Sequence, residues 1–143
     1  MSRPVMMTFA NLFELFTGLG WEVINLLDKM DPAVRSMKGI SLYAISPNGF
    51  VLSVQAGFGV RSDPNQAAHE YSTVEAAVWV DGGKGRKIGS FIRDDNFGTE
   101  DEVMGNVDFF RLRAMSQIIM KWSDRNPPIF FMRRKNTRWG GLS

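Results

Sequence analysis

The residue types best suited to chemistry in this chain gather between positions 91 and 113, where aromatic rings, guanidinium groups and an amide follow one another. Rings stack on a nucleobase, guanidinium forks hold phosphate, and an amide hydrogen-bonds a base or ribose, so this set would bind a nucleotide without cleaving it. The open alternative is that the rings belong to the core and that the arginines are solvated or pair with nearby acids. The candidate ligand-binding residues are Arg61, Phe91, Arg93, Asn96, Phe109, Arg111 and Arg113.

The sequence offers little that would support catalysis or metal binding. It has no cysteine and a single histidine, His69, beside which no nucleophile stands out. The stretch 82–87, GGKGRK, lacks P-loop spacing and no helix is expected after it, so a basic hairpin turn is favoured. The acids between 94 and 102 fit no calcium-loop pattern and indicate a solvated loop. We therefore expect a protein that is not an enzyme, with no catalytic residues, no cofactor and no metal.

Arg61 would be delivered by the stretch 48–61, NGFVLSVQAGFGVR, which opens with a turn dipeptide and continues as an alternating strand. Its even-numbered residues from 50 to 56 would face the core, and the opposite face, with Val51 and Ser53, would be open to a ligand or a partner. An ordinary hairpin is the plainer alternative. Gly57 and Gly59 would let the backbone bend sharply or approach another molecule closely.

Around these residues the pattern predicts an α+β fold, a small mainly antiparallel sheet packed against two helical elements. The first element is a kinked helix, or two helical pieces, over residues 8–30, closed by Asp31-Pro32. We expect a sheet of about four strands. These strands would cover residues 39–46, 49–57, 71–80 and 86–92.

A polar loop over 93–106 then leads to Asp108, which has the chemistry of an N-cap for an amphipathic helix ending near residue 122. This helix is expected to cover one face of the sheet. The spacing places an apolar stripe toward the sheet, with two further apolar residues beside it, and turns the polar residues away. The stripe is Phe110, Ala114, Ile118 and Trp122, flanked by Met115 and Ile119.

The whole chain, 1–143, is expected to be one domain, made of a helical N-terminal segment (1–38), a sheet and helix core (39–124) and a basic tail (125–143). The tail carries five positive charges and no acid, so the overall charge of +2 leaves −3 for residues 1–124. An alternative function is therefore a structural or inhibitor protein whose basic tail binds a partner protein or nucleic acid.

Apolar residues on more than one stripe of the 8–30 segment indicate burial on several sides, which a homo-oligomer would supply. No stretch reads as a secretory signal or a transmembrane segment, so we expect a cytoplasmic protein that does not bind membranes.

Three motifs carry a resemblance to a known family: LSVQAG (52–57), a strand that reads Tyr71-Ser72-x-Val74-Glu75, and Glu102-Val103-x-Gly105-x-Val107 before the last helix. Their order is similar to that of the first type of Thoeris anti-defence protein, a phage-encoded sponge. The chain departs from that pattern in residues 59–64, where a Tyr-Cys-x-Pro-Arg run would be expected.

The resemblance implies a non-enzymatic phage protein that acts in the cytoplasm of the host cell. It would sequester cyclic ADP-ribose isomers or, as some members do, cyclic oligonucleotides. It would also assemble into oligomers that bind the signal at subunit interfaces.

Overall fold

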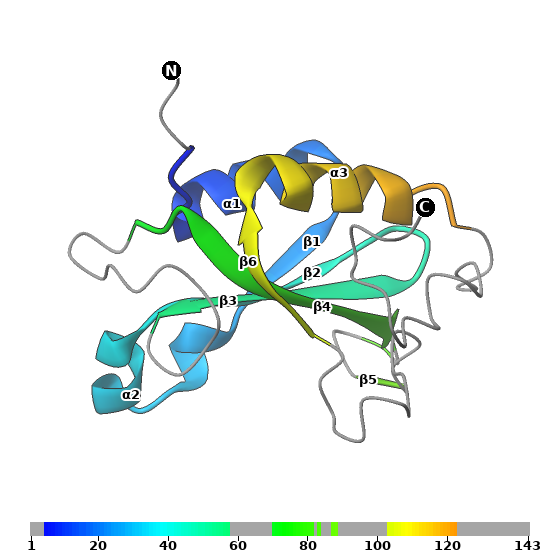
Figure 1. The fold of residues 1–143 in the computed structure, drawn as a ribbon. Coiled ribbons are helices and arrows are strands. Elements are labelled where there is room, and N and C mark those ends of the chain that lie inside the picture. Colours follow the sequence, from blue (N-terminus) through cyan, green and yellow to red (C-terminus); the bar gives the residue numbers. More distant parts are fainter. Residues whose placement is uncertain (1–4, 58–69, 82, 84–86, 89–102, 123–143) are drawn as a thin grey trace, which may run out of the picture.

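The α+β class is confirmed by the computed structural model, which describes residues 5–57, 70–81, 83, 87–88 and 103–122. Helix α1 comes first along the described chain, β1, a short 3₁₀ helix (η1) and α2 follow, and strands β2 to β6 then precede α3 (Figure 1). The elements are α1 (Phe9–Gly18), β1 (Glu22–Asn25), η1 (Leu26–Lys29), α2 (Pro32–Met37), β2 (Lys38–Ile45), β3 (Phe50–Gly57), β4 (Thr73–Asp81), β5 (Lys87–Ile88), β6 (Val103–Asp108) and α3 (Phe109–Ile119).

The strands form one antiparallel sheet in the order β1-β2-β3-β4, with β5 and β6 both paired to β4. Leu52 marks the register across its middle, opposite Ala44 on β2 and Val78 on β4. The expected strands over 39–46, 49–57 and 71–80 are thereby confirmed to within two residues. They were predictable because alternating apolar residues and a short Pro-Asn-Gly connection favour a hairpin.

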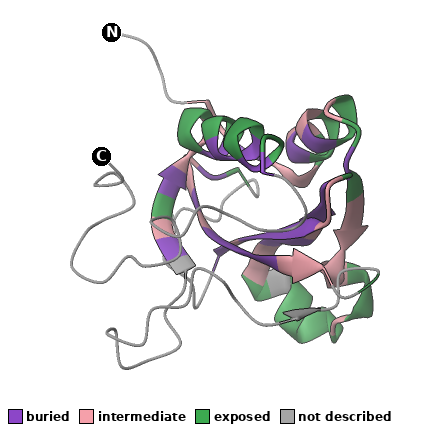
Figure 2. Cartoon of the chain, turned by 90° about the vertical axis from the view of Figure 1, so that its right-hand side faces the viewer, coloured by how far each residue is buried: buried purple, intermediate pink, exposed green. Residues whose placement is uncertain are grey.

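Helices α1 and α3 lie over one face of the sheet, and α2 lies apart from them near the start of β2 (Figures 1 and 2). The even-numbered residues of β3 face this helix layer and are buried, as the alternation predicts. The inward side chains of α1 and α3, such as Leu12 and Leu112, are also buried. The main core therefore lies between the sheet and these two helices. Fully buried members of this core include Leu12, Phe16, Leu42, Phe50, Leu52, Val54, Val78, Leu112 and Ile119.

Helix α1 begins where it does because Thr8 and Asn11 form a reciprocal capping box. The Thr8 hydroxyl accepts from the Asn11 backbone N–H at 3.1 Å, and the Asn11 side-chain oxygen accepts from the Thr8 N–H at 2.8 Å. Immediately before the cap, the backbones of Met7 and Tyr71 exchange two hydrogen bonds of 2.7 and 2.9 Å. The start of α1 is therefore tied to the chain that enters β4.

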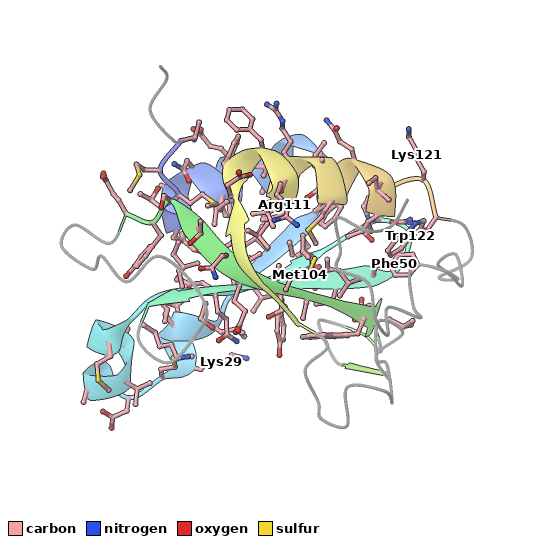
Figure 3. All side chains as sticks on the ribbon, in the orientation of Figure 1. Lys29, Phe50, Met104, Arg111, Lys121 and Trp122 are labelled. Atoms are coloured by element: carbon pink, nitrogen blue, oxygen red, sulfur yellow. The ribbon has the colours of Figure 1, made fainter. Side chains whose placement is uncertain are left out.

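The other end of the helix layer is fastened by the turn between β2 and β3. The side-chain nitrogen of Asn48 donates to the carbonyl oxygens of Ile119 and Trp122, both at 2.8 Å. The Trp122 ring packs edge-on against Phe50, with centroids 5.0 Å apart, and Figure 3 labels this pair. An asparagine that the sequence indicates as a turn residue thus also satisfies carbonyls at the C-terminal end of α3.

The second half of the expected N-terminal helix is wrong. Within residues 8–30 only α1 is α-helical. Residues 22–25 form β1, which pairs with β2, and residues 26–29 form the short 3₁₀ helix η1. Val23 and Ile24 are β-branched and suit a strand, and their spacing also fits a helix, so periodicity alone could not separate the two.

Two further boundaries differ from expectation. Asp31-Pro32 starts a helix instead of closing one: the Asp31 carboxylate accepts from the Ala33 N–H at 2.9 Å, and Pro32 stands in the first turn of α2. Residues 103–106, expected in a polar loop, belong to β6.

Candidate functional site

The N-terminal end of α3 is the only part of the expected binding cluster within the described residues. Strand β6 runs directly into α3, and Asp108 is the N-cap, its carboxylate accepting from the Arg111 N–H at 2.8 Å. The capping role predicted for Asp108 is therefore confirmed. It sets Phe109 and Phe110 in the first turn of the helix.

Strand β6 contains a bulge shortly before α3 begins. The pairing with β4 slips between Met104 and Val107, where one more residue lies on β6 than on its partner. Asn106, inside the bulge, has a φ of 54°, a left-handed conformation that asparagine tolerates better than most residues. Met104 and Val107 are both buried and fix the two sides of the bulge.

Phe109, Phe110 and Arg113 form one cluster at this end of α3. The two rings meet edge-on with centroids 5.7 Å apart, and the Arg113 guanidinium carbon lies 5.7 Å from the Phe109 centroid and 5.3 Å from that of Phe110. These distances lie within the range of a cation–π contact. Phe109 is half-buried against the core, whereas Phe110 is 53% exposed and Arg113 is exposed. The cluster thus presents one ring and one oriented cation to the solvent.

Arg111 is exposed but lies on another side of the helix. Residues 111 and 113 are about 200° apart around a helix axis with 3.6 residues per turn. Figure 3 labels Arg111 on α3. The structure therefore brings Phe109 and Arg113 together, adds Phe110, and leaves Arg111 outside this ring contact. Arg61, Phe91, Arg93 and Asn96 lie outside the described residues.

The electrostatics of this helix are positive on its exposed side. Residues 109–122 contain Arg111, Arg113 and Lys121 and no acid, and all three cations are exposed. The helix start itself is poorly suited to an anion, because the Asp108 carboxylate already accepts from a first-turn N–H and brings a negative charge there. Any phosphate at this end would be held by guanidinium groups.

The inward stripe predicted for α3 is partly wrong: Trp122 and the flanking Met115 and Ile119 are buried as predicted, but the rest of the stripe is not. Phe110, Ala114 and Ile118 are exposed, and the buried side is instead made of Leu112, Met115, Ser116 and Ile119. Both sets have helical spacing, so periodicity alone does not choose between them, and the buried set includes a serine. The Ser116 hydroxyl donates to the Leu112 carbonyl at 2.9 Å, which satisfies the hydroxyl inside the core.

The sheet face turned away from α1 and α3 was also expected to meet a ligand or a partner. In the structure Val51 is fully buried and Ser53 is 6% exposed. Tyr43 and Trp79 meet edge-on across this face with centroids 5.2 Å apart. We therefore correct the expectation for Val51 and Ser53: both sides of β3 are enclosed at these positions.

Gly57, which was expected to allow a close approach to another molecule, makes its close approach within the chain. It has a φ of +118°, and a Cβ there would lie 2.7 Å from the Gly39 nitrogen and 2.8 Å from the Met37 carbonyl oxygen. The glycine is explained by the tight packing between the ends of β2 and β3. Gly59 lies outside the described residues.

The fold and this cluster define a small α+β protein with an antiparallel sheet, two helices on one face and an exposed aromatic–arginine group at a helix start. No family model, no curated protein and no solved structure matches the chain.

The described ranges hold no group of three or more histidine, cysteine, aspartate or glutamate side chains placed to bind a metal ion. Among the helices there, none has the length and hydropathy needed to cross a membrane.

Proposed function

We propose that this protein is a non-enzymatic phage anti-defence protein that sequesters a cyclic ADP-ribose-type or cyclic oligonucleotide signal. The observation that carries the proposal is the Arg113 guanidinium held over the two rings of Phe109 and Phe110. The resemblance of the LSVQAG, Tyr-Ser-x-Val-Glu and Glu-Val-x-Gly-x-Val motifs to the Thoeris anti-defence family supports it independently.

The cluster suits a nucleotide because it offers two complementary contacts at one place. The exposed Phe110 ring presents a face on which a base can stack. Arg113 is fixed in direction by its ring contacts, so it would lose little freedom on holding a phosphate. Arg111 adds a second exposed positive charge nearby, on another side of the same helix turn. Neither contact activates a nucleophile or moves a proton, which is why we propose capture without hydrolysis.

Homo-oligomerisation is the second part of the proposal. Large apolar side chains are exposed on both helices of the helix layer, among them Phe13 on α1 and Ile118 on α3. A second copy of the chain would remove these side chains from water. The host cytoplasm, where such a signal circulates, is the location proposed for the complex.

Native mass spectrometry with cyclic ADP-ribose isomers and cyclic dinucleotides tests both parts, since it reports the subunit number and the bound mass together. The bound nucleotide is then released by denaturation. We expect its mass to be unchanged, whereas recovery of a cleaved product would contradict the non-enzymatic proposal. Failure of every nucleotide in the panel to bind would contradict the proposed ligand class.

Arg113→Ala tests the site itself. We expect a loss of affinity of about tenfold or more, because a charge-assisted contact to phosphate and the orientation of the rings are removed together. Lys121→Ala is the matched control, since it removes an exposed cation from the other end of the same helix. Equal losses for the two variants would mean that only the general charge of α3 matters, and the proposed cluster would be wrong.

A further inference from the structure

Asn48 is the side chain that fastens the C-terminal end of α3, and it is followed by a glycine. Asparagine is among the chemically labile residues of proteins. A following glycine exposes its backbone nitrogen to the asparagine side chain because it carries no Cβ. The residue that holds α3 in place is thus also the one most open to chemical change in the β2–β3 turn.

We propose that Asn48 is a site of spontaneous deamidation, that docking of α3 suppresses the reaction, and that the product releases the end of α3. In the first step the Gly49 nitrogen loses its proton and bonds to the Asn48 side-chain carbonyl carbon. The bond from that carbon to the side-chain nitrogen breaks, and ammonia leaves. Water then opens the five-membered imide, which yields aspartate or its isomer with the chain running through the side-chain carboxyl.

The docked helix holds one of the two reacting nitrogens, and the turn itself holds the other. The leaving nitrogen of Asn48 donates to the carbonyl oxygens of Ile119 and Trp122, at 2.8 Å each. The attacking nitrogen of Gly49 donates to the Ser46 carbonyl at 3.1 Å, inside the same turn. The side chain and the turn must both move before the two atoms can bond, so the reaction requires a local opening of the structure.

The product does not fit the place that Asn48 occupies. An aspartate has no N–H to donate, and its negative charge would face two carbonyl oxygens at the helix C-terminus, which is itself negative. The isomeric product also lengthens the backbone within a turn closed by a 2.8 Å hydrogen bond between the Ser46 nitrogen and the Phe50 oxygen. Deamidation would therefore break the attachment between Asn48 and the end of α3, which had slowed the reaction. The reaction is irreversible, so the attachment would not form again.

The reaction rate is measured by mass spectrometry of the full chain after incubation at neutral pH, which detects the replacement of –NH₂ by –OH at residue 48. A synthetic peptide covering 45–52 gives the rate of the unprotected sequence. Trp122→Ala removes the ring contact with Phe50 and leaves the Asn-Gly pair intact. Lys121→Ala, an exposed neighbour, is the matched control. If Trp122→Ala does not fold, Trp122→Phe takes its place.

We expect the intact protein and Lys121→Ala to deamidate about tenfold more slowly than the peptide, or slower still, and the Trp122 variant to approach the peptide. Equal deamidation rates in the intact protein and the peptide would overturn the proposal. A Trp122 variant that deamidates no faster than the intact protein would also overturn it. The product is tested separately by hydrogen exchange on the deamidated fraction, separated by charge. Faster exchange at the Lys121 and Trp122 amides is expected, and unchanged exchange would overturn the proposed release of α3.

Discussion

Gly39 has less room for a side chain than the described glycines at positions 18, 20, 57 and 83. It lies at the start of β2, and a Cβ built there would fall on the ring and hydroxyl of Tyr71. Tyr71 is fully buried, and its backbone is paired with that of Met7, so it cannot move aside without disturbing the start of β4. The glycine is needed because a ring occupies the space above it.

Gly39→Ala should therefore destabilise the protein by about 2 kcal/mol or more, because overpacking a rigid site costs on the order of 1–3 kcal/mol. Urea unfolding followed by tryptophan fluorescence measures the change. Gly18→Ala is the control: a Cβ there has nothing within 4 Å, and the residue is helical, so a neutral or slightly stabilising effect is expected. Similar destabilisation in both variants would show that Tyr71 is not the cause.

Sequence reasoning at this scale found the grouping of Phe109 with Arg113 but assigned Phe110 to the wrong side of the helix. The residue types suggested ring and guanidinium contacts, and the structure has two of them. What the types could not show was the rotation of α3, because two stripes have the same spacing. The structure buries the stripe that contains Ser116, whose hydroxyl is satisfied on its own helix.

Each end of the helix layer is held by side chains that satisfy backbone groups. At the start of α1 these are Thr8 and Asn11, and at the end of α3 it is Asn48. The indole nitrogen of Trp21 also donates to the Met120 sulfur at 2.9 Å, which joins the chain after α1 to the end of α3. The two helices are thus connected to each other as well as to the sheet.

Thr8→Ala should lower the free energy of unfolding by about 1 kcal/mol, because the capping hydroxyl is lost while the Asn11 N–H stays half-buried. Thermal or urea unfolding detects such a change. Thr17→Ala is the control. The Thr17 hydroxyl donates only to the Phe13 carbonyl, at 2.7 Å, on the exposed side of the same helix. A larger loss in Thr17→Ala than in Thr8→Ala would contradict the role assigned to the cap.

The central strands were predictable and the outer elements were not, for a physical reason. Strands β2, β3 and β4 are long enough for alternation to be visible, and an Asn-Gly turn joins two of them. Strand β1 has four residues, and β6 contains Gly105 and the left-handed Asn106, so neither shows a clean period of two. Pairing with a neighbouring strand, which a local pattern does not contain, makes both of them strands.

At the scale of the whole molecule, β3 is the strand on which the fold depends. It pairs with β2 on one side and β4 on the other, and seven of its eight residues are buried. Leu52 lies at its centre with no exposed surface, facing the helix layer. Loss of packing at this position affects the sheet and both helices together.

Leu52→Ala should cost about 3 kcal/mol, since removing a buried leucine side chain typically costs 2–5 kcal/mol. The denaturant midpoint should fall while the slope of the transition is kept, which shows that stability and not compactness has changed. Val34→Ala on α2, where the side chain is 40% exposed, should change stability by about 0.5 kcal/mol at most. An equal cost for the two variants would show that the core does not lie where the structure has it.

The attachment of α3 at the β2–β3 turn also bears on how the chain folds as it is synthesised. The partners of Asn48 and Phe50 at the end of α3 lie more than 70 residues further along the chain. The central hairpin therefore leaves the ribosome well before the helix that covers it, and its apolar face is bare during that interval. Because nascent chains with bare apolar surface associate with each other, synthesis that stalls before residue 109 should produce aggregated fragments.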